Sequence, residues 1–519
     1  MNGSVTPRDD ELEAWLGQAL VVRSAPMPLT KPGPSVQEMP PNPSAGGNPL
    51  GASQRLRAMM LGVPFCYFVV TGTLALLNNE NSSVLAYLGV LLLATVMFAP
   101  AAMMPGIGPA HVLVFPALWW FANLAGRQTT TVVSGLSEHV ALPGVTASEL
   151  NLLFAQLQLL TAVGHAALIL GYFLFRKPAA PLLEVRPATF IRAKTLIIIG
   201  CSAIVLALYE RLVGGFEGML LIRGMNRVMR DELRGGGHFT VLLSIPVFLS
   251  YLLYAIWPLA RKSPLFWATF GFALASSFLV SGSRAALFYP LIILLLIHYL
   301  LTGNLPKLPL VASVIGAWLL IGMIGIFRTE HFGAKSVDWG LFSDYEIGDY
   351  FDASSTTIVT RATQRYGSLP ALYYVPDDQP LLLGSTYLRV LLAPFPQALL
   401  PFDKPLAAGR LNGQTFFSID AGVPCGPIIE AYWNFHVPGV IILYFILGVI
   451  SAYVHRWYIA NRSVAGAAAF YVLFIFYFKF ESDALVQFIQ ATVIIFCLFV
   501  FFCGFPRLRG RRPDLTPSP

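Results

Sequence analysis

The sequence predicts an all-α polytopic membrane protein with about a dozen transmembrane helices. The chain of 519 residues is 56% hydrophobic and only 12% charged, whereas soluble domains carry about 25% charged residues. A chain this long and this apolar cannot bury its apolar side chains in one soluble core. Its apolar residues also form successive runs that are long enough to cross a bilayer as helices.

Twelve apolar segments have the length and composition of membrane spans, and a loop of about 109 residues separates the ninth from the tenth. We predict these spans at about 59–77, 82–100, 107–125, 151–175, 195–210, 239–258, 265–280, 285–301, 308–327, 437–455, 465–480 and 484–504.

Lysine and arginine are commoner in the short loops on the side of the N-terminus than in the opposite loops. The positive-inside rule therefore places both termini in the cytoplasm. The N-terminal residues are polar, rich in Pro, Gly and Ser, and contain no apolar signal-peptide core, so we expect disorder there. The predicted parts are a disordered cytoplasmic tail at 1–54, spans one to nine at 55–327 with an Arg-rich outer loop at 211–238, a large extracytoplasmic loop at 328–436, spans ten to twelve at 437–504, and a basic cytoplasmic tail at 505–519.

The outer loop between spans five and six contains four arginines spaced three or four residues apart: Arg223, Arg227, Arg230 and Arg234. On a helix this spacing places all four on one face, where like charges repel. An anionic ligand would relieve the repulsion, and arginine suits bidentate contact with phosphate. The alternative is a surface helix whose arginines contact lipid headgroups.

Arg284 stands between spans seven and eight in the motif SGSR. A charge this close to hydrocarbon is expensive and indicates a functional site. The alternative is an arginine that snorkels to the membrane surface.

The large loop carries both signs of charge. Its candidate cations for a leaving phosphate are Arg328, Arg389, Lys404 and Arg410, and its candidate proton acceptors are Glu430 and, in reserve, Asp420. We also expect short helices in this loop near 354–366 and 386–393.

Several classes of chemistry have no support in the sequence. There is no P-loop, no GxSxG, no Rossmann fingerprint and no paired metal-ligand spacing, so we expect no cofactor and no metal. The basic residues are not clustered as nucleic-acid binding requires. We interpret Lys479, Glu481 and Asp483 as an ordinary solvated turn, and His111, His165 and His298 as satisfied by local hydrogen bonds.

Three motifs in order resemble the Wzy-type polymerases of bacterial surface polysaccharides. They are SGSR at 281–284, APFPQALLPFDKP at 393–405, and AGVPCGPIIEAYWNFHVPGVIILYFILG at 421–448. Together they cover roughly the second half of the chain. The sequence departs from the family at His436, where the resemblance predicts glycine.

The resemblance implies a glycosyltransferase that polymerises undecaprenyl-pyrophosphate-linked repeat units at the outer face of the bacterial inner membrane. The reaction needs no nucleotide sugar, because the pyrophosphate linkage is already activated. The chain-length regulator and the flippase of the same pathway are expected partners, together with membrane lipid. Under this interpretation Arg284 and the outer arginines stabilise the departing pyrophosphate, and Glu430 accepts the proton. The alternatives are an O-antigen ligase, and a transporter or flippase of lipid-linked or anionic solutes.

Overall fold

The structure is a computed structural model of the whole chain. It describes residues 54–77, 81–104, 107–134, 142, 144–175, 181–224, 236–281, 285–305, 315–316, 319–320, 322–327, 340, 345–354, 367–393, 395, 399–420, 422–464, 466–479 and 481–508. Over these residues nine helices are long and apolar enough to cross a membrane: α2 (Gln54–Leu77), α3 (Asn81–Met103), α6 (Ala147–Leu174), α7 (Ile191–Leu212), α10 (Gly236–Ile256), α11 (Pro264–Ser281), α12 (Ala285–Thr302), α18 (Pro427–Ala460) and α20 (Ser482–Cys503). The expectation of an all-α polytopic membrane protein is confirmed at this level.

These nine helices correspond to nine of the predicted spans, and two of the others differ from expectation. The segment predicted at 107–125 is not helical before Phe115, because Gly108 and Pro109 interrupt the chain and Pro116 lies in the first turn of a new helix. Three consecutive pieces then follow: α4 (Phe115–Trp120), the π-helix η1 (Phe121–Ala125) and α5 (Gly126–Ser134). The segment predicted at 465–480 contains the short α19 (Ala467–Tyr477). The segment at 308–327 lies mostly outside the described residues.

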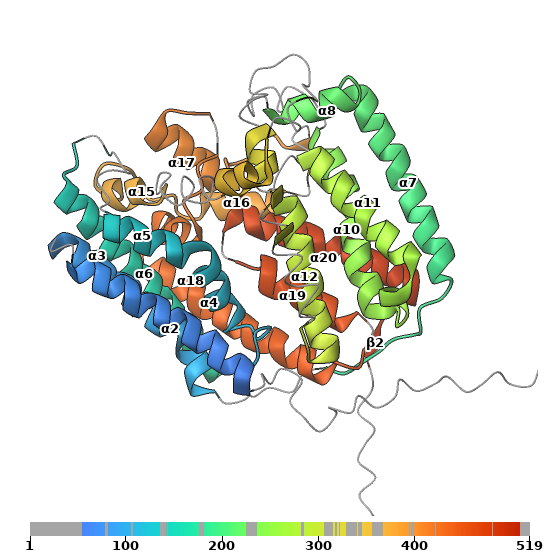
Figure 1. The fold of residues 1–519 in the computed structure, drawn as a ribbon, viewed down its shortest axis with the longest axis horizontal. Helices are drawn as coiled ribbons and strands as arrows, with labels where there is room; N and C mark the ends of the chain where they lie inside the picture. The colour runs from blue at the N-terminus through green and yellow to red at the C-terminus, as the bar shows by residue number, and fades with distance from the viewer. Residues whose placement is uncertain are drawn as a thin grey trace, which may run out of the picture. The chain divides into compact units, whose positions relative to one another are not determined.

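Helices α6 and α18 pack against each other more extensively than any other pair of described elements (Figure 1). Their backbones approach closely at two glycines. A Cβ on Gly171 would lie 2.2 Å from the carbonyl oxygen of Phe445, and one on Gly448 would lie 2.0 Å from that of Leu168. Small residues at such contacts are what allow membrane helices to pack by van der Waals contact.

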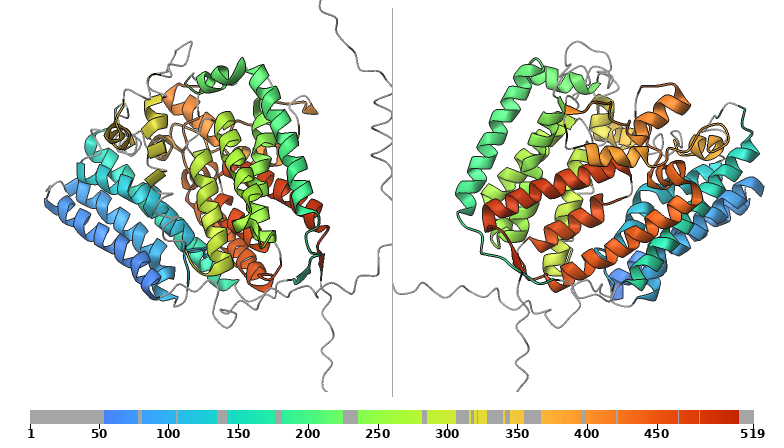
Figure 2. Two further views of the ribbon diagram at one scale, coloured as in Figure 1. Left: turned by 45° about the vertical axis from the view of Figure 1, so that its right-hand side comes forward. Right: turned by 180° about the vertical axis from the view of Figure 1, so that it is seen from behind.

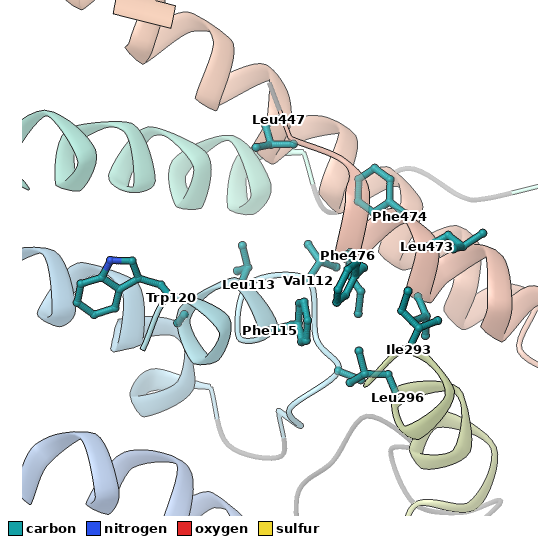
Figure 3. Close-up of a cluster of buried hydrophobic side chains, with 14 of the residues drawn as sticks. Val112, Leu113, Phe115, Trp120, Ile293, Leu296, Leu447, Leu473, Phe474 and Phe476 are labelled. Atoms are coloured by element: carbon teal, nitrogen blue, oxygen red, sulfur yellow. The ribbon is translucent and has the colours of Figure 1, made fainter. Parts of the chain in front are cut away.

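One group of helices, around α3, packs on α6, and a second group, around α10, reaches α18 through α19. Helix α3 contacts α6, α2 and α5, whereas α10 contacts α7, α11, α12, α19 and α20 (Figure 2). Between the groups, side chains from α4, α12, α18 and α19 form a buried hydrophobic cluster, shown in Figure 3. Phe115, Trp120, Ile293, Leu447 and Phe476 belong to it.

Short helices cover one end of α6, α18 and α20. They are α15 (Leu369–Tyr374), which contacts α6 and α18; α16 (Ser385–Leu392), which contacts α20; and α17 (Ala408–Phe417), which contacts α15. Helix α16 is the helix expected near 386–393, whereas the one expected near 354–366 falls largely outside the described residues. The remaining elements are α8 (Gly215–Gly224), the 3-10 turn η2 (Ala260–Lys262), and the two-residue strands β1 (Leu183–Glu184) and β2 (Arg507–Leu508), which pair antiparallel.

Candidate functional site

Helix α18 is broken near its start, and the break shapes the candidate site. Phe435 and His436 leave helical geometry, and His436 has φ +56° and ψ −158°. This region of backbone space is adopted essentially by glycine alone. The motif resemblance predicts glycine at this position, so the departure at His436 coincides with a conformation that glycine adopts without strain.

The segment before the break is tied to the start of α16. The side chain of Asn434 accepts a hydrogen bond from Gly384 N at 2.8 Å and donates to Thr386 Oγ1 at 2.9 Å. Backbone bonds from Leu382 and Leu383 to the carbonyls of Trp433 and Asn434 add to this connection. The first turns of α18 are therefore held against α16 independently of the membrane-spanning part.

Glu430 lies in the first turn of α18 and is fully buried, with 0% of its surface exposed. Its Oε2 accepts a hydrogen bond from the backbone N–H of Ser482 at 2.9 Å. Its Oε1 has no hydrogen-bond partner among the described residues. In this arrangement the carboxylate binds the first residue of α20, and none of its surface is exposed to solvent.

The turn between α19 and α20 brings Lys479, Glu481 and Asp483 to the same place. It is not the solvated turn that the sequence suggests, because Ser482 is fully buried and Lys479 and Glu481 are partly buried. The local sequence shows the charged residues but does not show that they are buried, because residues of α18 and α16, distant in the chain, cover this turn. The sequence feature that could have indicated a functional role for this turn is a short charged segment between two apolar ones.

Lys479 and Glu481 line a cavity of about 300 Å³. The cavity lies between α4, α5, α6, the start of α18 and the end of α19, and most of its wall is apolar. Six aromatic side chains contribute to that wall: Phe115, Trp119, Trp120, Tyr444, Phe476 and Phe478. Figure 3 shows three of them, Phe115, Trp120 and Phe476, on facing elements.

Burial alters the ionisation of both charged groups on the cavity wall. It raises the pKa of Glu481, which Lys479 partly counteracts. It also lowers the pKa of Lys479, and here the charge of Glu481 acts in the opposite direction. Both shifts move the groups toward their neutral forms, as expected when charges leave water.

A larger cavity, of about 960 Å³, lies between α2 and α3. No charged side chain is found in its wall. It therefore offers a surface for hydrocarbon chains but no group for acid–base or phosphate chemistry.

Two predicted basic residues, Arg389 and Lys404, make contacts near the start of α20. Arg389, on α16, donates from Nη1 to the carbonyl of Pro405 at 3.1 Å, and its Nε lies 3.9 Å from Oδ1 of Asp483. Lys404 donates to the carbonyl of Phe395. Arg389 thereby connects α16 to the same turn that Glu430 holds.

Asp420 and Arg410 form an exposed ion pair with each other. The sequence suggests separate roles for them, Asp420 as a proton acceptor and Arg410 as a phosphate-binding cation. Arg410 donates from Nε and Nη2 to the two carboxylate oxygens at 2.9 and 2.8 Å, and Gln414 donates at 2.7 Å. These bonds, with Arg410 the largest contributor, lower the pKa of Asp420. A carboxylate held in this way is a poor proton acceptor.

The remaining predicted site residues cannot be assigned contacts. Arg223 lies in the last turn of α8, but its side chain is outside the described residues, as are the whole of Arg227, Arg230, Arg234, Arg284 and Arg328.

Over the part of the chain that is described, no group of three or more His, Cys, Asp or Glu side chains is arranged to hold a metal ion. The expectation of local hydrogen bonds is confirmed for His165, which bonds the carbonyl of Thr161, and for His111, which accepts from Leu113 N–H and also bonds Tyr172 of α6. It is wrong for His298, whose side chain bonds Tyr254 on α10.

Comparison of this chain with models of known protein families, with curated proteins and with solved structures gives no match. The fold and site therefore define a class only, a multi-pass helical membrane protein with charged side chains at one end of an apolar cavity.

Proposed function

We propose that the protein is a membrane glycosyltransferase that polymerises undecaprenyl-pyrophosphate-linked oligosaccharide repeat units, by an inverting-type transfer with pyrophosphate as the leaving group. The observation that carries this proposal is the pairing of a largely apolar cavity with Lys479 and Glu481 on its wall. A lipid-linked pyrophosphate likewise combines an apolar chain with a charged head group, and these match the apolar wall and its charged side chains. The three sequence motifs supply the class of reaction.

The proposed location is the bacterial inner membrane, with both termini cytoplasmic and residues 328–436 periplasmic. The distribution of lysine and arginine supports this orientation. The polymer would be O-antigen, capsule or exopolysaccharide, and a flippase would deliver the substrate to the outer leaflet. A chain-length regulator is the other proposed partner.

Cations are required where charge develops on the leaving group. We assign this role to Arg284, with support from Arg223, Arg227, Arg230, Arg234, Arg328, Arg389 and Lys404. Arg389 lies where α16 meets α20, and it donates to the carbonyl of Pro405, the residue after Lys404. Arg410 is the weaker candidate, because Asp420 already engages its guanidinium.

The test uses purified protein in nanodiscs with undecaprenyl-pyrophosphate-linked repeat units and no nucleotide sugar, followed by gel separation of the lipid-linked glycans. The expected result is a ladder of multiples that is lost in Arg284→Ala, since removal of one donor to an oxyanion costs about 2–4 kcal/mol in the transition state. Arg192→Ala, at an exposed position of α7, is the control. Absence of a ladder from wild-type protein with verified substrate would overturn the polymerase proposal, and lipid A core would then be added to test ligation.

A further inference from the structure

Lys479 and Glu481 are two opposite charges that line one cavity, and each acts on the pKa of the other through its charge. Neither side chain forms a hydrogen bond or a salt bridge with any residue that the structure describes. Charges withdrawn from water are costly unless they are paired or hydrogen-bonded. Lys479 and Glu481 offset each other's charge in part, but neither is hydrogen-bonded, so a polar ligand in the cavity would complete their interactions.

The backbone around this pair is fixed from two sides. Glu481 is the residue before α20, and its neighbour Ser482 is bonded to Glu430 on α18. Two residues further along, Asp483 lies beside Arg389 on α16. The turn is thus anchored by groups that do not line the cavity, which leaves Lys479 and Glu481 available to a ligand. Such anchoring of reactive side chains by a supporting shell is what precise positioning requires.

The cavity wall restricts the chemistry of that ligand. An ammonium group favours an anion, and a carboxylate favours a proton donor such as a hydroxyl. The surrounding aromatic and aliphatic wall favours hydrocarbon. The matching ligand is an amphiphile with a phosphate-type head, brought together with a hydroxyl group.

We propose that Glu481 is the proton acceptor of the transfer reaction and that Lys479 contacts the phosphate of the lipid-linked donor. This inference rests on the proposed function. In the step, the acceptor hydroxyl oxygen bonds to the anomeric carbon while the bond from that carbon to the pyrophosphate oxygen breaks. The electron pair leaves with the pyrophosphate, and the hydroxyl proton passes to Glu481.

Two observations favour Glu481 over the carboxylates that the sequence suggests. Glu430 is fully buried and is bonded to Ser482, and Asp420 is engaged by Arg410.

The test compares wild type, Lys479→Gln and Glu481→Gln in nanodiscs, with Lys262→Gln and Glu184→Gln as matched controls at exposed positions. Glu481→Gln should lower kcat for ladder formation by about 10²-fold or more with little change in KM. It should also abolish the fall in rate that wild type shows as pH falls through the raised pKa of Glu481. Lys479→Gln should weaken equilibrium binding of farnesyl pyrophosphate by about tenfold or more. The controls should behave as wild type.

Binding of farnesyl pyrophosphate also reports whether Glu481→Gln is folded, because that variant should retain it, and the unfolding temperature reports whether Lys479→Gln is folded. A wild-type rate in Glu481→Gln would overturn the proton-acceptor role while the proposed function stands. Unchanged affinity in Lys479→Gln would overturn the phosphate contact. If wild type forms no ladder, the proposed function and the proton-acceptor role of Glu481 are both wrong. The binding measurement then tests separately whether Lys479 contacts phosphate.

Discussion

The carboxylate of Glu430 accepts a hydrogen bond of 2.9 Å from the backbone N–H of Ser482, which joins the first turn of α18 to the first residue of α20. The N–H groups in the first turn of a helix have no partners within the helix. A buried carboxylate from a different helix satisfies one of them here. This contact sets the turn that carries Lys479 and Glu481, so Glu430 acts on the cavity through the backbone.

Replacing Glu430 should test this connection through stability. Glu430→Ala removes a buried acceptor and leaves a void, which should cost about 2–4 kcal/mol. Glu430→Gln retains one side-chain oxygen as an acceptor for Ser482 and should cost less. Thermal unfolding in detergent, followed by intrinsic fluorescence, measures the difference. Equal unfolding temperatures for the two variants would contradict the hydrogen-bond role.

The close contact of α6 and α18 predicts a strong effect at Gly448. A Cβ there would meet the backbone carbonyl of Leu168 at 2.0 Å, and a backbone atom can yield only if the helices separate. Gly448→Ala should therefore cost about 1–3 kcal/mol or more and lower the unfolding temperature. Gly200→Ala on α7 is the matched control, because no atom lies within 4 Å of the added Cβ. It should be neutral or stabilising by up to about 1 kcal/mol. A similar loss in both variants would argue against the close packing.

The backbone at His436 predicts a stabilising substitution. Its φ of +56° with ψ of −158° costs a non-glycine residue about 1–3 kcal/mol. His436→Gly should relieve most of that strain, even though the ring contact with Tyr432, 4.6 Å between centroids, is lost. His436→Ala loses the same contact and keeps the strain. The unfolding temperature should rank glycine above alanine, and the reverse order would show that the strain is absent.

The Arg410–Asp420 pair predicts a pH dependence. Because the pKa of Asp420 is lower in the folded protein, its contribution to stability is present above the ordinary aspartate pKa of about 4. That contribution is lost as pH falls through the lowered pKa. Hydrogen-exchange protection of Ile419 N–H, which is bonded to the carbonyl of Gly413 at 3.1 Å, should hold from neutral pH to about 4 and fall only below it. In Arg410→Gln the loss should begin at higher pH, and identical profiles would refute the coupling.

The proposed orientation predicts opposite labelling of two exposed positions. Ser418, after α17, should be periplasmic, and Lys262, between α10 and α11, should be cytoplasmic. In a background without native cysteines, Ser418→Cys should react with a membrane-impermeant maleimide added to spheroplasts. Lys262→Cys should react only after the membrane is disrupted. The inverse pattern would reverse the topology and remove the periplasmic site.

The membrane class and most of the helices follow from the sequence by itself. An apolar run of about 20 residues must form a helix in lipid, because each of its backbone N–H and C=O groups needs a partner within the segment. This constraint is local, so nine predicted spans correspond to long apolar helices in the described residues. The break near His436 also falls at the position where the motif resemblance predicts glycine.

The composition of the site was decided only by the tertiary structure. The sequence pointed to Glu430 and Asp420 as free carboxylates, but Glu430 is buried against Ser482, 52 residues away, and Asp420 is paired with Arg410. It also suggested a solvated turn where Lys479 and Glu481 line a cavity. Burial and pairing depend on which helices pack together, and residues distant in the chain supply the neighbours. No local pattern of charges contains that information.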